Sequence, residues 1–384
     1  MNNIYSLRIY DTALIRFSME KRGLEGLVAE IINVNTAFEH LMPLDMERTE
    51  EGIIKWLERR VIPKNRTFVD EILKTLGLSH NDTKGIIDVC KGLSLNDSYW
   101  VVPADFDGTF DKYNLYENRF SEMLALVAYT GAGQSKQAFT TSPELTTNGM
   151  LPKAWRYIEN DGIYLYKGGT CGASNAGREP YCEYYASQIA ETMQLNAVHY
   201  DLENWKGITA SKCALFTSKD ISYIPIGRIL KSGGLQKCLE YYDSKGRNFS
   251  EQIRSMLVFD ALIYNEDRHF GNFGILRDNH TGEILAPAPV FDNGLSLFCY
   301  AGKEDIPVLD EYARTRSNPY NISFEEVCAE VMGASQKEQL RRMIGFRFKR
   351  HPHLNLPEDH LAAIEKVLEV RVRELLSIPI RYKP

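Results

Sequence analysis

The sequence predicts an α+β fold in which strands dominate about the first 230 residues and helices dominate the rest. Apolar and polar residues alternate in several short runs of the first part, as in half-buried strands, whereas apolar residues recur at helical spacing in the second. The chain has 384 residues, of which 44% are hydrophobic and 25% charged, which is enough for two or three domain-sized cores. We therefore expect a globular protein with more than one domain.

The first predicted domain, residues 1–96, combines a small β unit with helices. Alternation from Tyr5 to about Leu41 predicts a few half-buried strands, and helical spacing replaces it between Glu50 and Leu95. These helices show apolar stripes and no catalytic pattern. We expect this domain to pack on the next one, to bind a partner, or both.

The second predicted domain, residues 97–230, contains a hairpin and a helix. Two alternating runs, 153–158 and 163–167, flank an Asp-Gly pair, which is a strong hairpin signal. A helix follows, in which Pro180 takes a first-turn position. We expect the hairpin and this helix to form the centre of the domain.

The third predicted domain, residues 231–384, is mostly helical. Clear helical periodicity covers Phe324–Met332 and Leu361–Leu376. A further helix is predicted from Ser250 to about Tyr264, and the chain leaves its end as a loop.

A polar island follows this last helix, in the run ALIYNEDRHFGNFGIL of residues 261–276. Acidic, basic, histidine and amide side chains stand there between two apolar segments, which costs stability unless something binds. After the island we expect a strand and, beyond a turn, a return strand at 284–291. Such a hairpin brings Asp292 close to Asn272 and Asp267.

Two carboxylates and an amide oxygen in one place favour Mg²⁺, which indicates a bound nucleotide. Phosphoryl transfer needs a base, metal ligands, and a lysine positioned by an acid. We assign Asp267 as the base and Asn272 and Asp292 as the metal ligands. Lys167, at the end of its strand, is expected to bind the phosphates of the nucleotide. Glu183, on the next helix, is expected to form an ion pair with Lys167.

Other polar residues near the island have simpler interpretations. His269 either anchors the loop by hydrogen bonds or takes part in proton transfer, and Arg268 braces a carboxylate. Asp260 is expected to be a buried acid bonded to nearby backbone. Each match taken singly could arise by chance, so their joint order along the chain carries the prediction.

The segment Asp267–Asn272 (DRHFGN), followed by Asp292, resembles the catalytic loop and metal-binding aspartate of the HipA-like serine/threonine kinases. That family shares its kinase core with phosphoinositide kinases. Lys167 and Glu183 extend the resemblance. It implies an ATP- and Mg²⁺-dependent protein kinase with a two-lobed fold: a mixed β small lobe with an added N-terminal subdomain, and a mostly helical large lobe. It also implies a toxin of a toxin–antitoxin pair, with a translation factor as substrate.

The segment 146–153 (TTNGMLPK) resembles the phosphate loop of the same family. Gly149 and Lys153 stand at matching places and are expected to bind ATP. Thr146 replaces the serine that the family autophosphorylates, and Ser142 and Thr147 lie close enough to compete with it. Phosphorylation there adds about two negative charges beside the nucleotide, which is expected to inhibit ATP binding.

The hinge between the two lobes is expected just after a short buried strand that the run Cys213–Phe216 predicts. Phe216 and Thr217 are expected to contact the nucleotide there.

The amino-acid composition limits the kinds of binding partner that we expect for this protein. The net charge of −6 argues against a protein that coats nucleic acid, so no direct nucleic-acid binding is expected. Seven cysteines without a CxxC pair argue against a zinc site or disulfide framework and suit a cytoplasmic protein. No signal peptide and no membrane-spanning segment are expected. The expected partners are ATP, a protein substrate and an antitoxin.

Two alternative functions stay open at the level of sequence. The Asp-Arg-His-x-x-Asn spelling is shared with phosphoinositide kinases, so a lipid or small-molecule kinase is the first alternative. The second is a nucleotide-binding regulator with little transfer activity.

Overall fold

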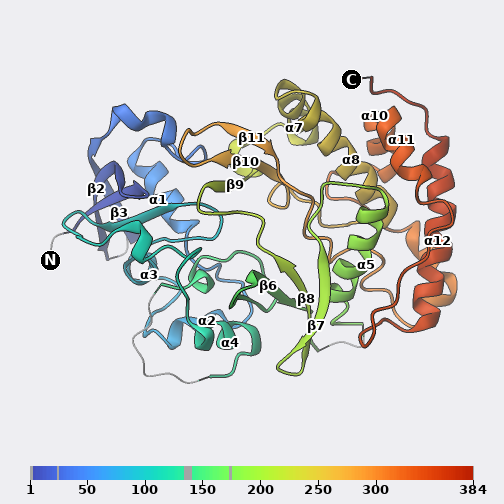
Figure 1. The fold of residues 1–384 in the computed structure, drawn as a ribbon, viewed down its shortest axis with the longest axis horizontal. Coiled ribbons are helices and arrows are strands. Elements are labelled where there is room, and N and C mark those ends of the chain that lie inside the picture. Colours follow the sequence, from blue (N-terminus) through green and yellow to red (C-terminus); the bar gives the residue numbers. More distant parts are fainter. Residues whose placement is uncertain (1–2, 24–25, 134–140, 173–174, 384) are drawn as a thin grey trace. The chain divides into compact units, whose positions relative to one another are not determined.

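The computed structural model describes residues 3–23, 26–133, 141–172 and 175–383 (Figure 1). Strands and helices are both abundant, which confirms the predicted α+β class. The chain folds into two compact units. Unit 1 comprises Met1–Tyr166, Leu215–Ile224 and Leu276–Leu285, and unit 2 comprises Lys167–Ala214, Pro225–Ile275 and Ala286–Pro384.

An antiparallel sheet of order β3-β2-β1-β4 opens unit 1. Its strands are β1 (Ile4–Ile9), β2 (Thr12–Arg22), β3 (Gly26–Val34) and β4 (Tyr99–Pro103). The first three confirm the strands predicted from the alternation, because their inward residues form the core. The fourth arrives after a helical segment and pairs with β1, placing Tyr99 opposite Ile9.

Helices cover this core. The helical spacing between Glu50 and Leu95 predicts α1 (Glu50–Glu58), α2 (Val69–Lys74) and α3 (Thr83–Cys90), whereas α4 (Glu122–Thr130) was not predicted. Three of them begin at a side chain that accepts a backbone N–H, namely Thr49, Asp82 and Ser121. Short 3-10 turns lie at Thr36–Leu41, Phe110–Lys112 and Pro143–Leu145.

The predicted hairpin is confirmed as β5 (Lys153–Ile158) and β6 (Gly162–Gly168). Its turn places Asn160 at φ +62° and Gly162 at φ +138°, which are conformations that asparagine and glycine tolerate. A second, three-stranded sheet has the order β11-β10-β9, formed by β9 (Ile221–Pro225), β10 (Gly274–Asp278) and β11 (Ile284–Pro287). β11 is shorter than the predicted return strand, because Pro287 and Pro289 lack the N–H that a ladder needs.

Unit 2 contains α5 (Glu179–Thr192), with Pro180 in its first turn as predicted, and the antiparallel pair β7 (Tyr200–Trp205) and β8 (Ile208–Ala214). The predicted strand Cys213–Phe216 is wrong in its bounds, because β8 begins earlier and ends at Ala214. β7 was not predicted, since charged and amide residues interrupt its apolar pattern. Lys206 and Gly207, at φ +56° and +81°, make the tight turn between the two strands.

Helices form the rest of unit 2, as predicted. They are α6 (Ile226–Ile229), α7 (Gly234–Ser244), α8 (Arg247–Ile263), α9 (Leu309–Ala313), α10 (Phe324–Val331), α11 (Ala334–Arg341) and α12 (Glu358–Ser377), with a 3-10 turn at Ile306–Val308. α8 is buried over most of its length and contacts α7, α10, α11 and α12. It ends at Tyr264, which adopts a left-handed φ of +53°.

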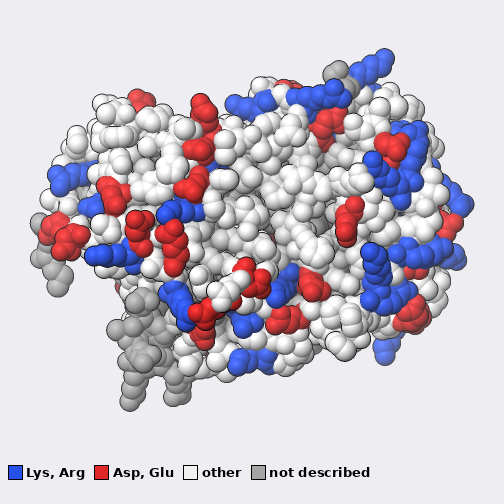
Figure 2. Space-filling model, viewed as in Figure 1, with Lys and Arg blue, Asp and Glu red and all other residues white. Residues whose placement is uncertain are grey.

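Acidic and basic side chains are interspersed over the face of the molecule in Figure 2. Within the described ranges, no helix is long and apolar enough to cross a membrane.

Candidate active site

Arg268 and Asp260 form a buried ion pair at the polar island of unit 2. Nε of Arg268 donates to Oδ2 of Asp260 at 2.9 Å, and its Nη2 donates to Oδ1 at 3.0 Å. The two side chains are only 1% and 5% exposed. Burial lowers the pKa of Arg268, but Asp260 outweighs this effect and raises it, so the guanidinium stays charged. Asp260 is therefore a buried acid as expected, with side-chain partners in place of backbone.

The loop after α8 is held by its own polar groups. Nδ2 of Asn265 donates to Oδ1 of Asp260 at 2.9 Å, and Oδ1 of Asn265 accepts the N–H of Asp267 at 3.1 Å. Nδ2 of Asn272 donates to the carbonyl of Asp267 at 3.1 Å. These bonds fix the backbone on both sides of Asp267, the predicted base.

Arg268 also joins this loop to the segment that contains Asp292. Its Nη1 donates to the carbonyls of Asn272, at 3.2 Å, and of Phe291, and its Nη2 donates to Oδ1 of Asn293 at 2.6 Å. The predicted approach of the two segments is thus confirmed. Arg268 braces a carboxylate, as expected, and also spans both sides of the site.

Lys167 contacts two carboxylates at once. Its Nζ donates to Oε1 of Glu183 at 2.8 Å and also to Oδ1 of Asp292. The exposed fractions are 12% for Lys167, 1% for Glu183 and 32% for Asp292, so the acid on α5 is buried and the other is accessible. Burial lowers the pKa of Lys167, but the two carboxylates raise it above its usual value. The ammonium group therefore stays charged.

Glu183 also fixes the backbone after Asp292. Its Oε2 accepts the N–H of Asn293 at 2.8 Å. Asp292 itself adopts a left-handed φ of +59°, and its N–H donates to the hydroxyl of Tyr200 at 3.1 Å. Such strained backbone is typical of functional sites.

The pKa of Asp267, the predicted base, is raised above its usual value. Burial raises the pKa of Asp267, and repulsion from Asp292 raises it further, while positive charges nearby oppose the shift. His269 is exposed, and its Nδ1 accepts the N–H of Gly271 at 3.0 Å. It thus anchors the loop by a hydrogen bond, one of the two roles considered for it. In the described part of the chain, no group of three or more His, Cys, Asp or Glu is arranged to hold a metal. The ligands expected from the sequence are one amide, Asn272, and one carboxylate, Asp292.

The candidate phosphate loop lies in unit 1, between the 3-10 turn Pro143–Leu145 and β5. Gly149 has a φ of +92°, a conformation that favours glycine, and Nζ of Lys153 donates to the carbonyl of Asn148 at 3.0 Å. Lys153 itself is buried. The loop is thus shaped by its own backbone and by this lysine.

The three candidate phosphorylation sites differ in access. Ser142 and Thr146 are buried, and the hydroxyl of Thr146 donates to the carbonyl of Leu93 at 2.8 Å. Thr147 is half-buried, and its hydroxyl donates to the carbonyl of Pro143 at 2.7 Å. Modification of the two buried residues requires the loop to open.

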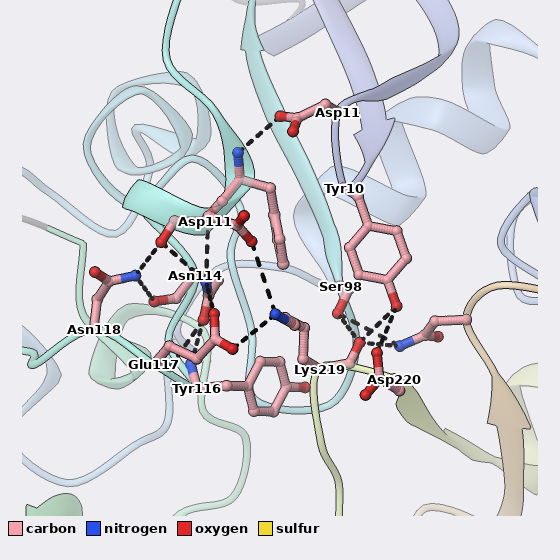
Figure 3. Close-up of polar contacts among 12 residues, drawn as sticks. Tyr10, Asp11, Ser98, Asp111, Asn114, Tyr116, Glu117, Asn118, Lys219 and Asp220 are labelled. Atoms are coloured by element: carbon pink, nitrogen blue, oxygen red, sulfur yellow. Dashed lines mark hydrogen bonds and ion pairs between the residues drawn. The ribbon is translucent and has the colours of Figure 1, made fainter.

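Phe216 and Thr217 also lie in unit 1. Thr217 is buried and donates its hydroxyl to the carbonyl of Leu95, and Phe216 packs edge-on against Tyr223. The residues just after them are fixed by Lys219, whose Nζ lies 2.7 Å from Glu117 and 3.8 Å from Asp111 (Figure 3). Its carbonyl accepts bonds from three side chains: Tyr10, Ser98 and Asn279.

Comparison with solved structures gives two informative matches. The chain is similar to the Helicobacter pylori proinflammatory kinase CtkA, with a TM-score of 0.50 and 19% identity, over 60% of this chain and 91% of that one. It is also similar to the HipA toxin–antitoxin structure of Shewanella oneidensis MR-1, which contains HipA, HipB and operator DNA. Here the TM-score is 0.55 and the identity 12%, over 98% of this chain and 100% of that one.

The chain has a HipA-like fold. The likeness confirms the predicted resemblance at the level of fold. The sequence matches no family model and no curated protein.

Sequence reasoning missed several residues that build the candidate site. Asn265 and Asn293 are polar residues next to predicted site residues, so their position in the chain was a usable signal. Tyr200 and Tyr320 are far from the island in sequence, and nothing in the sequence pointed to them. The hydroxyl of Tyr320 donates to the carbonyl of Arg268 at 2.6 Å, so it supports the loop from the C-terminal side.

Proposed function

We propose that this protein is an ATP- and Mg²⁺-dependent kinase that phosphorylates a serine or threonine of another protein. The observation that carries the proposal is the contact of Lys167 with both Glu183 and Asp292, beside a loop that presents Asp267. A lysine held by a buried acid and an accessible one is suited to bind phosphates, because its charge is kept and its position is fixed.

The residues present fit a magnesium nucleotide. Asn272 directs its Nδ2 to the carbonyl of Asp267, so its Oδ1 is the amide atom left for a ligand. The accessible carboxylate of Asp292 already contacts a cation, the ammonium of Lys167. Amide and carboxylate oxygens are the hard donors that Mg²⁺ prefers. When bound, Mg²⁺–ATP supplies the phosphoryl group and neutralises its charge.

In this proposal Asp267 accepts the proton of the acceptor hydroxyl, and its raised pKa makes it a better base than an exposed aspartate. Lys167 binds the phosphates of the nucleotide. Residues 1–96 form an added subdomain, residues 97–230 the small lobe and residues 231–384 the large lobe. Phe216 and Thr217 contact the nucleotide at the hinge.

We extend the proposal to a role as the toxin of a toxin–antitoxin pair. Support comes from the similar fold of HipA, which was solved with HipB and operator DNA. Expression of the wild-type protein is then expected to arrest growth, and Asp267→Ala is expected to abolish the arrest. Arrest by both proteins would contradict a toxic role for phosphoryl transfer.

Inhibitory autophosphorylation in the 142–147 loop also belongs to the proposal. Thr147 is the most exposed of the three candidate residues, so it is the expected acceptor in the folded protein. Mass spectrometry after incubation with ATP and Mg²⁺ tests this expectation. An unmodified loop in protein that transfers phosphate elsewhere would contradict it.

The class of acceptor is tested by acid hydrolysis of the labelled products. Phosphoserine or phosphothreonine from a labelled protein band supports the proposal. Transfer of label only to lipids or small molecules would contradict the assignment as a protein kinase, although it would leave phosphoryl transfer in place.

A further inference from the structure

We propose that Arg66 is a positioning residue that holds the candidate phosphate loop, residues 146–153, in the conformation that binds an anion. The inference rests on the proposed function, because it concerns the loop assigned to ATP. Arg66 lies between α1 and α2, in a segment for which the sequence indicates no catalytic pattern. Its side chain and that of Glu144 are both 0% exposed.

The guanidinium of Arg66 contacts both ends of the loop. Nη1 donates to the carbonyls of Glu144, at 2.9 Å, and Thr147, at 3.3 Å. Nη2 donates to Oε2 of Glu144 at 2.6 Å and to the carbonyl of Lys153 at 2.7 Å. One side chain thus joins a residue before the candidate loop, a residue within it and its last residue.

Thr67, the residue after Arg66, binds a fourth carbonyl of the same segment. Both the N–H and the hydroxyl of Thr67 donate to the carbonyl of Met150 at 2.8 Å. Arg66 and Thr67 together therefore bind carbonyls at every third position of the segment: 144, 147, 150 and 153.

Glu144 links the same segment to β5. Its Oε1 accepts the N–H of Trp155 at 2.7 Å, and Nε1 of Trp155 donates to the hydroxyl of Thr147 at 3.0 Å. The carboxylate is therefore satisfied on both oxygens. The segment is therefore bonded to Arg66 through the ion pair and to β5 through Trp155.

The backbone N–H groups of the loop are available to bind an anion. Across the residues that the structure describes, the N–H groups of residues 147–150 donate no hydrogen bond. Gly149 is left-handed, and successive backbone N–H groups around such a residue form an anion-binding concavity. Because Arg66 and Thr67 hold the carbonyls, the loop can present its N–H groups to phosphate.

The variant Arg66→Lys tests this role, since lysine keeps the charge but cannot make the forked set of bonds. In nucleotide-free protein, amide exchange of Thr67 and Trp155 is expected to become about 10-fold faster, because their N–H groups bond to Met150 and Glu144 and lose these partners when the loop opens. The KM for ATP is expected to rise about 10-fold while kcat changes less than about 3-fold, since Arg66 does not touch the reacting groups.

Arg277→Lys is the matched control. Arg277 is buried in the same unit and donates at 2.9 Å to the carbonyl of Met42 and to the hydroxyl of Tyr99, away from the loop. Arg277→Lys is expected to leave the amide exchange of Thr67 and Trp155 and the KM for ATP unchanged. Should Arg66→Lys fail to fold, Glu144→Gln removes the same ion pair while retaining an acceptor for the N–H of Trp155, and the same two results are expected.

Either of two results would overturn the inference: unchanged amide exchange of Thr67 and Trp155, or faster exchange of these amides with an unchanged KM for ATP. Failure of the proposed function is a separate outcome. Wild-type protein that binds no ATP would reject that function, whereas the exchange measurement still decides whether Arg66 holds the loop.

Discussion

Arg268 and Asp260 form a two-point ion pair, with Nε–Oδ2 and Nη2–Oδ1 distances of 2.9 and 3.0 Å, beneath the candidate active site. The same guanidinium binds the backbone of Asn272 and Phe291 and the side chain of Asn293. One buried arginine therefore fixes the distance between the loop of Asp267 and the segment of Asp292.

Arg268→Met is expected to lower the free energy of unfolding by about 3–5 kcal/mol, because it leaves the carboxylate of Asp260 buried without its partner. Transfer activity is expected to fall by about 100-fold in the protein that stays folded, since the two segments lose their fixed separation. Urea unfolding and initial-rate assays measure these effects. Arg373→Met removes an exposed ion pair on α12 and is expected to change stability by less than about 1 kcal/mol. Equal effects of the two variants would contradict the role of Arg268.

Glu183→Gln is expected to raise the KM for ATP about 10-fold, because Lys167 loses the buried charge that positions it. Glutamine still offers an oxygen to the N–H of Asn293, so the fold should persist. ATP titration of the transfer rate provides the measurement. Glu191→Gln, an exposed position on the same helix, is the control. ATP affinity that is unaltered in Glu183→Gln would count against the ion pair as a phosphate-binding device.

The pH dependence of transfer is expected to follow Asp267. A base works in its ionised form, and burial raises the pKa of this carboxyl, so activity should fall on acidification at a higher pH than an ordinary aspartate allows. The electrostatic interaction with His269 lowers the pKa of Asp267, and His269→Gln is therefore expected to move the acid limb to higher pH. Profiles of kcat/KM between about pH 4 and pH 8 test both statements. A shift to lower pH in the variant would show that His269 acts otherwise.

Gly149→Ala is expected to weaken ATP binding, because alanine is strained at a φ of +92° and its Cβ would lie 2.2 Å from Nζ of Lys153. The backbone strain costs about 1–3 kcal/mol. Gly207→Ala is a matched control, with a φ of +81° in the β7–β8 turn and no atom within 4 Å of the added Cβ. Thermal unfolding should show both losses of stability, whereas calorimetric titration with ATP should distinguish the two variants. Equal ATP affinity in both would contradict the assignment of the loop.

Much of this arrangement follows from local sequence. The helix before the island, the hairpin that ends near Lys167 and the helix of Glu183 all have clear periodicity or turn signals. The approach of Asp292 to Asn272 follows from reading the segment between them as a hairpin. The predicted roles of these residues in catalysis and ATP binding stay predictions.

Other parts could not be predicted because their partners are distant in the chain. Arg66 reaches Glu144 and Lys153, 78 and 87 positions away, and nothing near Arg66 indicates those contacts. The pairing of Arg268 with Asp260 crosses the end of a helix, where an acid in an apolar stripe has many possible partners. β7 escaped notice because polar residues obscure its alternation.

Transfer of the labelled γ-phosphate of ATP is the most direct test of the proposed kinase activity. Wild-type protein, Asp267→Ala and Asp292→Ala are each incubated with Mg²⁺, ATP and a cell extract, and labelled proteins are separated. If the protein is a kinase, the wild type is expected to label itself or a discrete protein band. Neither variant is expected to do so. Wild-type protein that binds ATP but labels no protein, or variants that label as well as wild type, would contradict the proposed kinase activity.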